Sequence, residues 1–195
     1  MKIKIANNSI KAIIFDMVGV LLFKKINYIP RSQREINAEK IEKFYNHLDD
    51  KKLLSDLKEK AGLTTKEISE ALPYIPRKYE KFKELWDLLP ILKKNYKLAV
   101  INNGNNLAEK YWKKKFGFNI FDAFVNSAKE KVKKPNPKIY LITCKKLNVK
   151  PKNCLFMDDT EENIIAAKRL KMKTILWKKG KKKEHLRKFI SIIQS

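Results

Sequence analysis

Five short apolar runs that alternate with longer helical patterns constrain the fold of this chain more than any other feature. The runs lie at residues 11–16, 97–102, 122–128, 153–157 and 173–177. Helical periodicity fills most intervals, at residues 80–94, 106–115, 137–147, 161–171 and 182–194. Strands that alternate with helices predict βαβ units and a parallel sheet covered on both faces. The nearly uniform apolarity of the runs agrees with this, so we expect an α/β fold.

One long interval interrupts the alternation. Residues 23–82 lie between the first run and the helix that leads to the second, and they contain helical patterns at 32–48, 51–62 and 64–72. Thr64 and Glu67 have the spacing of a helix-capping pair. An insertion directly after the first strand emerges where open α/β sheets bind ligands. We therefore predict that residues 23–82 form an α-helical cap on a core of residues 1–22 and 83–195, rather than a layer packed on the sheet.

The net charge of the chain raises nucleic acid as a partner. The formal charge is +24, from 45 basic and 21 acidic residues. Lysine is spread through every segment, however, and does not gather into one patch. We therefore predict a non-specific, salt-sensitive affinity for polyanions and no dedicated nucleic-acid site.

The sequence also bears on location. The lysines and apolar run at the start could be mistaken for a signal peptide, but Asp16 interrupts the run and no small-residue cleavage site follows. No segment reaches the roughly 18 uninterrupted apolar residues of a membrane span. Cys144 and Cys154 lie in apolar or amphipathic segments and are expected to be reduced core thiols. We expect a cytoplasmic protein without a membrane partner, and its oligomeric state stays open.

Acidic residues end two of the expected strands. Asp16 ends the first run, and Gly19 allows a sharp turn just after it. Asp158 and Asp159 directly follow the fourth run. Adjacent carboxylates repel each other unless a cation is bound, and hard oxygen ligands suit Mg²⁺. Helix capping by Asp159 is the alternative, and it explains one aspartate more easily than two.

Two further short motifs are weak signals by themselves. Asn102, Asn103 and Gly104 follow the second run and can offer amide and backbone N–H groups to an oxyanion, although an ordinary turn explains them equally well. Lys134 stands before Pro135, in a segment whose backbone is restricted by proline. A lysine held in this way is a good clamp for phosphate or carboxylate, and the alternative is a solvated surface charge.

Together, the motifs resemble those of the haloacid dehalogenase superfamily. The segments FDMVGVL, VINNGN, KKPNPKIY and DDTEENIIAAK occur in the family's order, with the helical interval after the first. The resemblance covers nearly the whole chain. It implies a three-layer Rossmann-like core with a five-stranded parallel sheet in the order 5-4-1-2-3, and a small helical cap of the type inserted after the first motif. Asn102 replaces the serine or threonine that is usual in the second motif.

The resemblance implies catalytic and phosphate-binding roles for four of these residues. Asp16 is the expected nucleophile, which forms an aspartyl-phosphate that is later hydrolysed. Lys134 is expected to assist catalysis and to bind the phosphate together with Asn102 and Asn103. The implied activity is a Mg²⁺-dependent phosphatase for a small phosphorylated metabolite.

The resemblance also implies a metal site. The expected ligands of Mg²⁺ are the Asp16 carboxylate, the Val18 backbone carbonyl and the Asp159 carboxylate, with Asp158 as an outer or optional ligand. Asn163 is expected to orient the Asp159 carboxylate without binding the metal itself.

Val18 departs from the usual phosphatase pattern. Most family phosphatases carry at this position a second aspartate, which protonates the leaving group and then activates water. Valine does neither, so we expect slow turnover or a preference for activated esters. A non-catalytic protein that binds a phosphorylated ligand or polyanion is the main alternative. A 2-haloacid dehalogenase is a further one, but that branch lacks adjacent acids in the fourth motif, whereas this chain has Asp158 and Asp159.

Overall fold

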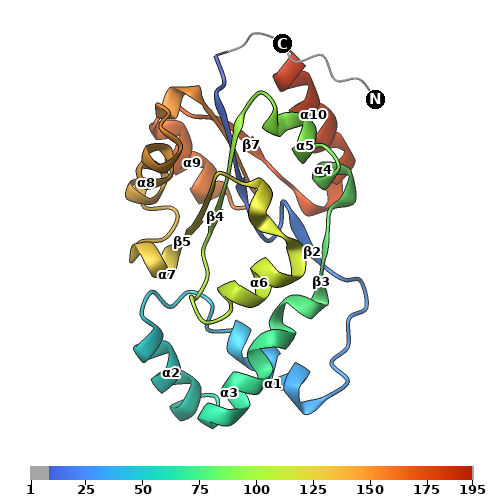
Figure 1. Ribbon diagram of the computed structural model, residues 1–195, viewed down its shortest axis with the longest axis vertical. Helices are drawn as coiled ribbons and strands as arrows, with labels where there is room; N and C mark the ends of the chain where they lie inside the picture. The colour runs from blue at the N-terminus through green and yellow to red at the C-terminus, as the bar shows by residue number, and fades with distance from the viewer. Residues whose placement is uncertain (1–8, 195) are drawn as a thin grey trace.

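A five-stranded parallel sheet forms the centre of the molecule in a computed structural model that describes residues 9–194 (Figure 1). Across the sheet, the strands follow the order β5 (Ala123–Asn126), β4 (Lys97–Asn102), β1 (Ala12–Asp16), β6 (Cys154–Asp158) and β7 (Lys173–Leu176). If these five strands are numbered 1 to 5 in chain order, they lie in the order 3-2-1-4-5. Read from the opposite edge of the sheet, this is 5-4-1-2-3, so each strand has its expected neighbours. Their numbers differ from the expectation because two short strands, β2 (Leu22–Lys24) and β3 (Tyr79–Lys81), intervene and form a separate antiparallel pair. The predicted α/β class is confirmed.

Successive residues of β1 point into two separate hydrophobic clusters. Ile13 and Phe15 pack into one cluster, whereas Ala12 and Ile14 pack into the other. All five residues of β1 are buried, as a strand covered on both faces requires. The uniform apolarity of the strands therefore follows from a three-layer structure.

Helices cover both faces of this sheet. In Figure 1, α8 (Pro137–Leu147) and α9 (Glu161–Arg169) cover the left face, whereas α4 (Lys83–Trp86), α5 (Leu89–Lys93) and α10 (Lys182–Gln194) lie on the right. Outside the interval between β2 and β3, the remaining described elements are α6 (Glu109–Phe116), α7 (Ser127–Glu130), η2 (Phe118–Ile120), η3 (Pro151–Asn153) and η4 (Lys179–Lys181). Cys144 of α8 and Cys154 of β6 are buried in the core, as predicted, and form no disulfide; their Sγ atoms lie 3.7 Å apart.

The helix predicted at residues 80–94 is wrong in detail, because β3, α4 and α5 occupy this segment. Pro90 explains the break between the two helices. Proline has no backbone N–H and crowds the preceding turn of a continuous helix, but it is well tolerated in the first turn of a new one. It accordingly lies in the first turn of α5.

Residues between β2 and β3 form α1 (Gln33–Glu42), α2 (Asp50–Glu59), α3 (Thr65–Ala71) and η1 (Leu72–Lys78). In Figure 1, these helices lie at the end of the molecule opposite α10. The predicted pairing of Thr64 and Glu67 is confirmed, because each side chain bonds the other's backbone at the start of α3. Apolar side chains of this segment, such as Ile41 and Leu53, belong to the same hydrophobic cluster as Phe15 of β1.

Several contacts join the helical segment to the sheet region. One is the β2–β3 pair, in which Leu22 is the register partner of Lys81. Another is Lys115 of α6, whose Nζ donates to the backbone oxygens of Pro76 and Tyr79 at 2.7 and 3.1 Å. Asn106 Nδ2 also donates to Asp50 Oδ2 at 3.2 Å, and Lys131 Nζ donates to the Leu48 carbonyl at 2.9 Å. The division into core and cap stays a prediction, and its parts at residues 1–8 and 195 lie outside the described residues.

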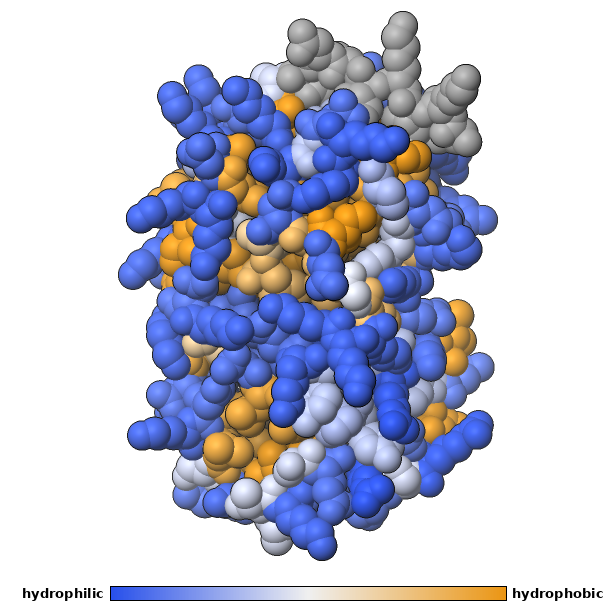
Figure 2. Space-filling view, in the orientation of Figure 1, coloured by the Kyte–Doolittle hydropathy of each residue, from blue (hydrophilic) through white to orange (hydrophobic). Residues whose placement is uncertain are grey.

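Hydrophilic side chains dominate the face shown in Figure 2, with smaller hydrophobic patches between them. This distribution agrees with lysines spread along the whole sequence. Within residues 9–194, no helix has the length and apolarity needed to cross a bilayer.

Candidate functional site

Three carboxylates meet at the carboxyl ends of two neighbouring strands. Asp16 ends β1 and Asp158 ends β6, and these strands pair in parallel, so their ends lie at the same edge of the sheet. Asp159 follows directly. One carboxylate oxygen from each residue lies within 4.8 Å of the other two. Asp16 and Asp159 are therefore close neighbours, and the predicted metal site they would form stays a prediction.

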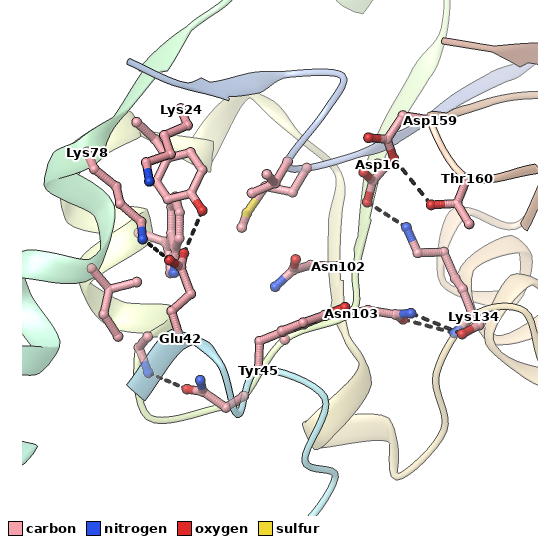
Figure 3. Close-up of a pocket in the computed structure, with 18 of the residues that line it drawn as sticks. Asp16, Lys24, Glu42, Tyr45, Lys78, Asn102, Asn103, Lys134, Asp159 and Thr160 are labelled. Carbon is pink, nitrogen blue, oxygen red and sulfur yellow. Dashed lines mark hydrogen bonds and ion pairs between the residues drawn. The ribbon is translucent and has the colours of Figure 1, made fainter. Parts of the chain in front are cut away.

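Lys134 lies between two of these carboxylates. Its Nζ is 2.5 Å from Asp16 Oδ1 and 2.7 Å from Asp158 Oδ2, and the residue is only 3% exposed (Figure 3). Burial alone would lower the pKa of Lys134, but the two carboxylates raise it, so the ammonium is retained. The lysine is therefore a buried cation and not a solvated surface charge.

One ammonium does not balance three carboxylates. Burial raises the pKa of Asp16 to about 7 although Lys134 opposes this, and the charge of Asp158 adds to the rise. The pKa of Asp159 is also raised, first by burial and then by Asp158. The site therefore holds excess negative charge that a bound cation would relieve.

Asn103 sets the position of Lys134. Its side-chain Oδ1 accepts from the Lys134 backbone N–H at 2.9 Å, and its Nδ2 donates to the Lys134 carbonyl at 3.0 Å. On the other side, Asn136 caps α8 and Pro137 begins it. Asn103 was predicted to contact the phosphate. Only one side-chain amide hydrogen and the backbone N–H of Asn103 remain available for that contact. Its observed side-chain bonds place the lysine.

Asn163 does not hold the residue that was predicted. It was expected to orient Asp159, but its Nδ2 donates to Asp158 Oδ1 at 2.9 Å. The same oxygen accepts from the backbone N–H of Thr160 at 2.9 Å. The first turn of α9 therefore folds back onto the end of β6. Asp158 is fully buried and fixed by Asn163, Thr160 and Lys134, whereas the structure leaves Asp159 exposed.

Asp159 lies against Gly19. A Cβ atom at position 19 would be only 2.2 Å from Asp159 Oδ2, and the φ of Gly19 is +106°. A side chain at position 19 would therefore displace this carboxylate as well as strain the backbone. The backbone carbonyls of Met17 and Leu22 accept the hydrogen bonds of this turn. No donor to the Val18 carbonyl is found among residues 9–194.

The geometry fits a hard divalent cation. Mg²⁺ takes oxygen ligands at about 2.0–2.1 Å in an octahedron, so neighbouring ligand oxygens lie roughly 3 Å apart. One oxygen from each of the three carboxylates lies within 4.8 Å of the others, and their excess negative charge favours a cation. Asp16, Asp159 and the Val18 carbonyl are the more accessible donors, since both oxygens of Asp158 already accept hydrogen bonds.

The loop after β4 approaches the lysine from the other side. Asn102 is buried and its Nδ2 lies over Gly104, where a Cβ atom would be only 2.3 Å away. The turn of Asn102, Asn103 and Gly104 was predicted to be able to offer N–H groups to an oxyanion. The Gly104 N–H is already used, because it donates to Ser127 Oγ at 3.1 Å. The Asn102 amide has no hydrogen-bond partner among residues 9–194, and it lines the cavity described below.

Sequence reasoning missed the residues that support this loop. Asn126 Nδ2 donates to the Asn105 carbonyl at 3.1 Å and to Glu109 Oε2 at 2.9 Å. Asn126 ends β5 and Ser127 follows this strand, both within the run predicted at residues 122–128, so the strand-end rule that found Asp16 and Asp158 also applied to them.

A cavity of about 610 Å³ joins the three carboxylates to the helical segment. Asp16, Asp159 and Lys134 lie on one wall, and Glu42, Lys24 and Lys78 lie on the other (Figure 3). Asn102 lies between the two walls in this view. The cavity is therefore large enough for a small organic molecule to contact both walls at once.

Comparison with protein families gives one match over most of the chain. Residues 10–171 match the family described as haloacid dehalogenase-like hydrolase. Among curated proteins, the chain is 37% identical over 98 residues to a glyceraldehyde 3-phosphate phosphatase of Pyrococcus furiosus. The aligned residues make up 48% of this chain and 40% of that protein. It is 32% identical over 116 residues to the Methanopyrus kandleri protein of the same name, and this alignment covers 55% of this chain and 49% of that protein. The chain thus spans less than half the length of these relatives.

Solved structures share the fold over nearly the whole length. A haloacid dehalogenase-family enzyme of Bacteroides thetaiotaomicron, in complex with magnesium and inorganic phosphate, has a TM-score of 0.70 and 24% identity and covers 91% of this chain and 98% of its own. A predicted hydrolase of the same family from Porphyromonas gingivalis has a TM-score of 0.66 and 21% identity, with 93% and 98% covered.

Proposed function

This chain belongs to the haloacid dehalogenase-like hydrolase family, and from that premise we propose that it is a Mg²⁺-dependent phosphatase acting on small phosphate monoesters. The observation that carries the proposal is the group formed by Asp16, Asp158, Asp159 and Lys134. It combines an accessible carboxylate, a buried ammonium and excess negative charge at one end of an open cavity. These are the components needed to bind a divalent cation and a phosphate together.

Asp16 supplies the nucleophile. Its Oδ1 accepts from Lys134, whereas its Oδ2 has no hydrogen-bond partner among the described residues and keeps its lone pairs for attack on phosphorus. The attack forms a bond between Asp16 and phosphorus and breaks the bond to the ester oxygen, which leaves with the electron pair and takes a proton from water because Val18 supplies none. Water then hydrolyses the aspartyl-phosphate and releases inorganic phosphate.

Lys134 and Asn102 bind the transferred phosphate. An ammonium has three protons, and Asp16 and Asp158 take two of them, so one remains for a phosphate oxygen. The unpartnered amide of Asn102 supplies a further donor. Asp158 acts by holding Lys134, and Asn163 acts by holding Asp158. When bound by Asp16, Asp159 and the Val18 carbonyl, Mg²⁺ would neutralise the charge that develops on the phosphate.

A screen of phosphate esters with and without metal tests the proposal. We expect release of phosphate from p-nitrophenyl phosphate in Mg²⁺, loss of this activity in excess EDTA, and its return when Mg²⁺ is restored, because the carboxylates repel the phosphate without a cation. Phosphate release is measured for each ester. Turnover that is unchanged by EDTA contradicts the proposal, as does dehalogenation of 2-chloropropionate that survives chelation.

Val18 provides a second test. General acid catalysis typically contributes about 10² to 10⁴ in rate, and alkoxide leaving groups depend on it most. Val18→Asp is therefore expected to raise kcat/KM for alkyl phosphates by up to about this factor, with a smaller gain for p-nitrophenyl phosphate. Val18→Asn is the matched control, because it has the same shape without the acid. Equal values for the parent and Val18→Asp would mean that another group already supplies the proton.

We also propose that residues 23–82 act as a cap that selects the substrate. The support is their position in the chain and in the cavity. They begin directly after the turn that carries Val18, and Glu39, Glu42 and Lys78 of this segment line the cavity wall facing Asp16.

A further inference from the structure

Five polar residues on the wall opposite Asp16 form a connected group, which we call the far-wall cluster. Glu39 and Glu42 come from α1, Lys78 ends η1, Tyr79 begins β3, and Lys24 ends β2. Although these elements are far apart in sequence, they meet at the cavity. The close-up in Figure 3 shows Lys24, Glu42 and Lys78 gathered on this wall.

Each member of the cluster is held by another. Lys78, only 6% exposed, pairs with Glu42 and lies 3.3 Å from Glu39 Oε1. Lys24 approaches the same Glu39 oxygen at 3.4 Å, and the Tyr79 hydroxyl donates to Glu42 Oε1 at 2.6 Å. Side chains that are bonded in this way keep their positions without a ligand, so the wall is preorganised.

Two positive and two negative groups leave the cluster without net charge. Burial opposes ionisation of Glu39, but Lys78 and then Lys24 outweigh it and lower its pKa, so this carboxylate remains an acceptor. Burial and then Glu42 raise the pKa of Tyr79, so its hydroxyl remains a donor. A second anionic group on a ligand would meet the carboxylates of Glu39 and Glu42 here, and the buried Lys78 is already paired with both.

Unused hydrogen-bonding capacity remains at the cavity. Glu39 uses only Oε1 in the contacts found among residues 9–194, so its Oε2 is free to accept. Lys24, whose side chain is 47% exposed, keeps ammonium protons for further bonds. An acceptor and a donor side by side match a hydroxyl group, which accepts one hydrogen bond and donates another.

We propose that the far-wall cluster binds the hydroxyl groups of an uncharged, polyhydroxylated leaving group, so that the substrate is the phosphate monoester of a sugar or polyol. This inference rests on the proposed phosphatase function. Trp112 and Tyr79 also line the cavity, and their rings lie 5.0 Å apart, which provides an apolar surface for the carbon chain. The phosphate then lies at Lys134 and Asn102 while the hydroxyls reach the opposite wall.

Substrates that differ in the leaving group test this class directly. We expect kcat/KM to be at least about tenfold higher for ribose 5-phosphate and glycerol 1-phosphate than for ethyl phosphate, because one hydrogen bond to a charged group is worth roughly this factor or more. The expected value for 3-phosphoglycerate is lower than for glycerol 1-phosphate, because its carboxylate meets Glu39 and Glu42. Equal values for ethyl and ribose phosphates, or a preference for 3-phosphoglycerate, overturn the inference.

Variants of the cluster make the test residue-specific. Glu42→Gln and Glu39→Gln are each expected to lower the ratio of kcat/KM for ribose 5-phosphate to that for p-nitrophenyl phosphate by about 10- to 100-fold, mainly through KM. The matched control is Glu70→Gln, which breaks the Arg34–Glu70 pair of the same helical segment, away from the cavity. If Glu42→Gln fails to fold, Glu39→Gln decides, because the Glu39 side chain is one-third exposed. An unchanged ratio in the folded variant overturns the inference.

Calorimetry separates this inference from the phosphatase proposal. Binding of ribose 5-phosphate and of ethyl phosphate to Asp16→Asn is measured in Mg²⁺, where turnover is not needed. Tighter binding of the ribose ester supports the ligand class even if the parent protein hydrolyses no ester, which would contradict only the phosphatase function. Equal dissociation constants overturn the ligand class, whatever the parent hydrolyses.

Discussion

Replacing Asp16 with asparagine is expected to lower kcat for p-nitrophenyl phosphate by roughly 10⁴-fold or more, as removal of a nucleophile does in other hydrolases. The amide nitrogen of asparagine has no lone pair available for attack on phosphorus, and its oxygen is a far weaker nucleophile than a carboxylate. The side chains have nearly the same shape, so the cavity and the contact with Lys134 Nζ are retained. The measurement is phosphate release in Mg²⁺ at equal protein concentrations.

The fold of Asp16→Asn is expected to remain intact. The substitution leaves two carboxylates near Lys134 in place of three, so repulsion at the strand ends decreases. We therefore expect a thermal midpoint no lower than that of the parent. Asp87→Asn is the matched control, since it breaks an exposed ion pair with Lys83 far from the cavity. Parental turnover by Asp16→Asn would show that Asp16 is not the nucleophile.

Lys134→Met is expected to have the largest effect on stability, a loss of about 3–5 kcal/mol in the free energy of unfolding, as is typical when one partner of a buried ion pair is removed. Methionine has a similar length, so the change acts mainly through charge. Asp16 and Asp158 then lose the ammonium that lies 2.5 and 2.7 Å away, and no other cation contacts them among the described residues. Urea unfolding in EDTA measures the loss.

Magnesium is expected to restore part of the stability lost in Lys134→Met. A cation that binds the folded state alone shifts the unfolding equilibrium, and the variant has the greater excess of negative charge at the site. Lys133→Met is the control, because Lys133 is the exposed neighbour. If both variants lose the same amount of stability, less than about 1 kcal/mol, Lys134 does not act as the buried counter-charge described here.

The main features of the sheet could be predicted because they depend on local patterns. A run such as Ala12–Asp16 is apolar at every position but its last, so its burial and the location of its carboxylate both follow from one rule. Asp158 follows from the same rule at the end of β6. Asp16 and Asp158 meet because the order of strands in a parallel sheet places β1 beside β6.

Side-chain partners across the site could not be predicted in the same way. Asn163 bonds to Asp158 and not to Asp159, and this choice depends on how α9 is rotated about its axis. Glu42 and Lys78 are far apart in sequence and meet only through the packing of α1 against η1. In a chain with 45 basic residues, no sequence pattern distinguishes Lys78 from the exposed lysines. Such pairs require the tertiary structure.

The antiparallel pair of β2 and β3 has a consequence for exchange of the helical segment between them. Both ends of the helical segment leave from adjacent strands, so the segment begins and ends at nearly one point. We therefore expect that another helical segment could be joined at this point without lengthening any strand of the central sheet. Such a segment must also supply apolar side chains in place of Ile41 and Leu53, which share a cluster with Phe15, and acceptors for Lys115, Asn106 and Lys131.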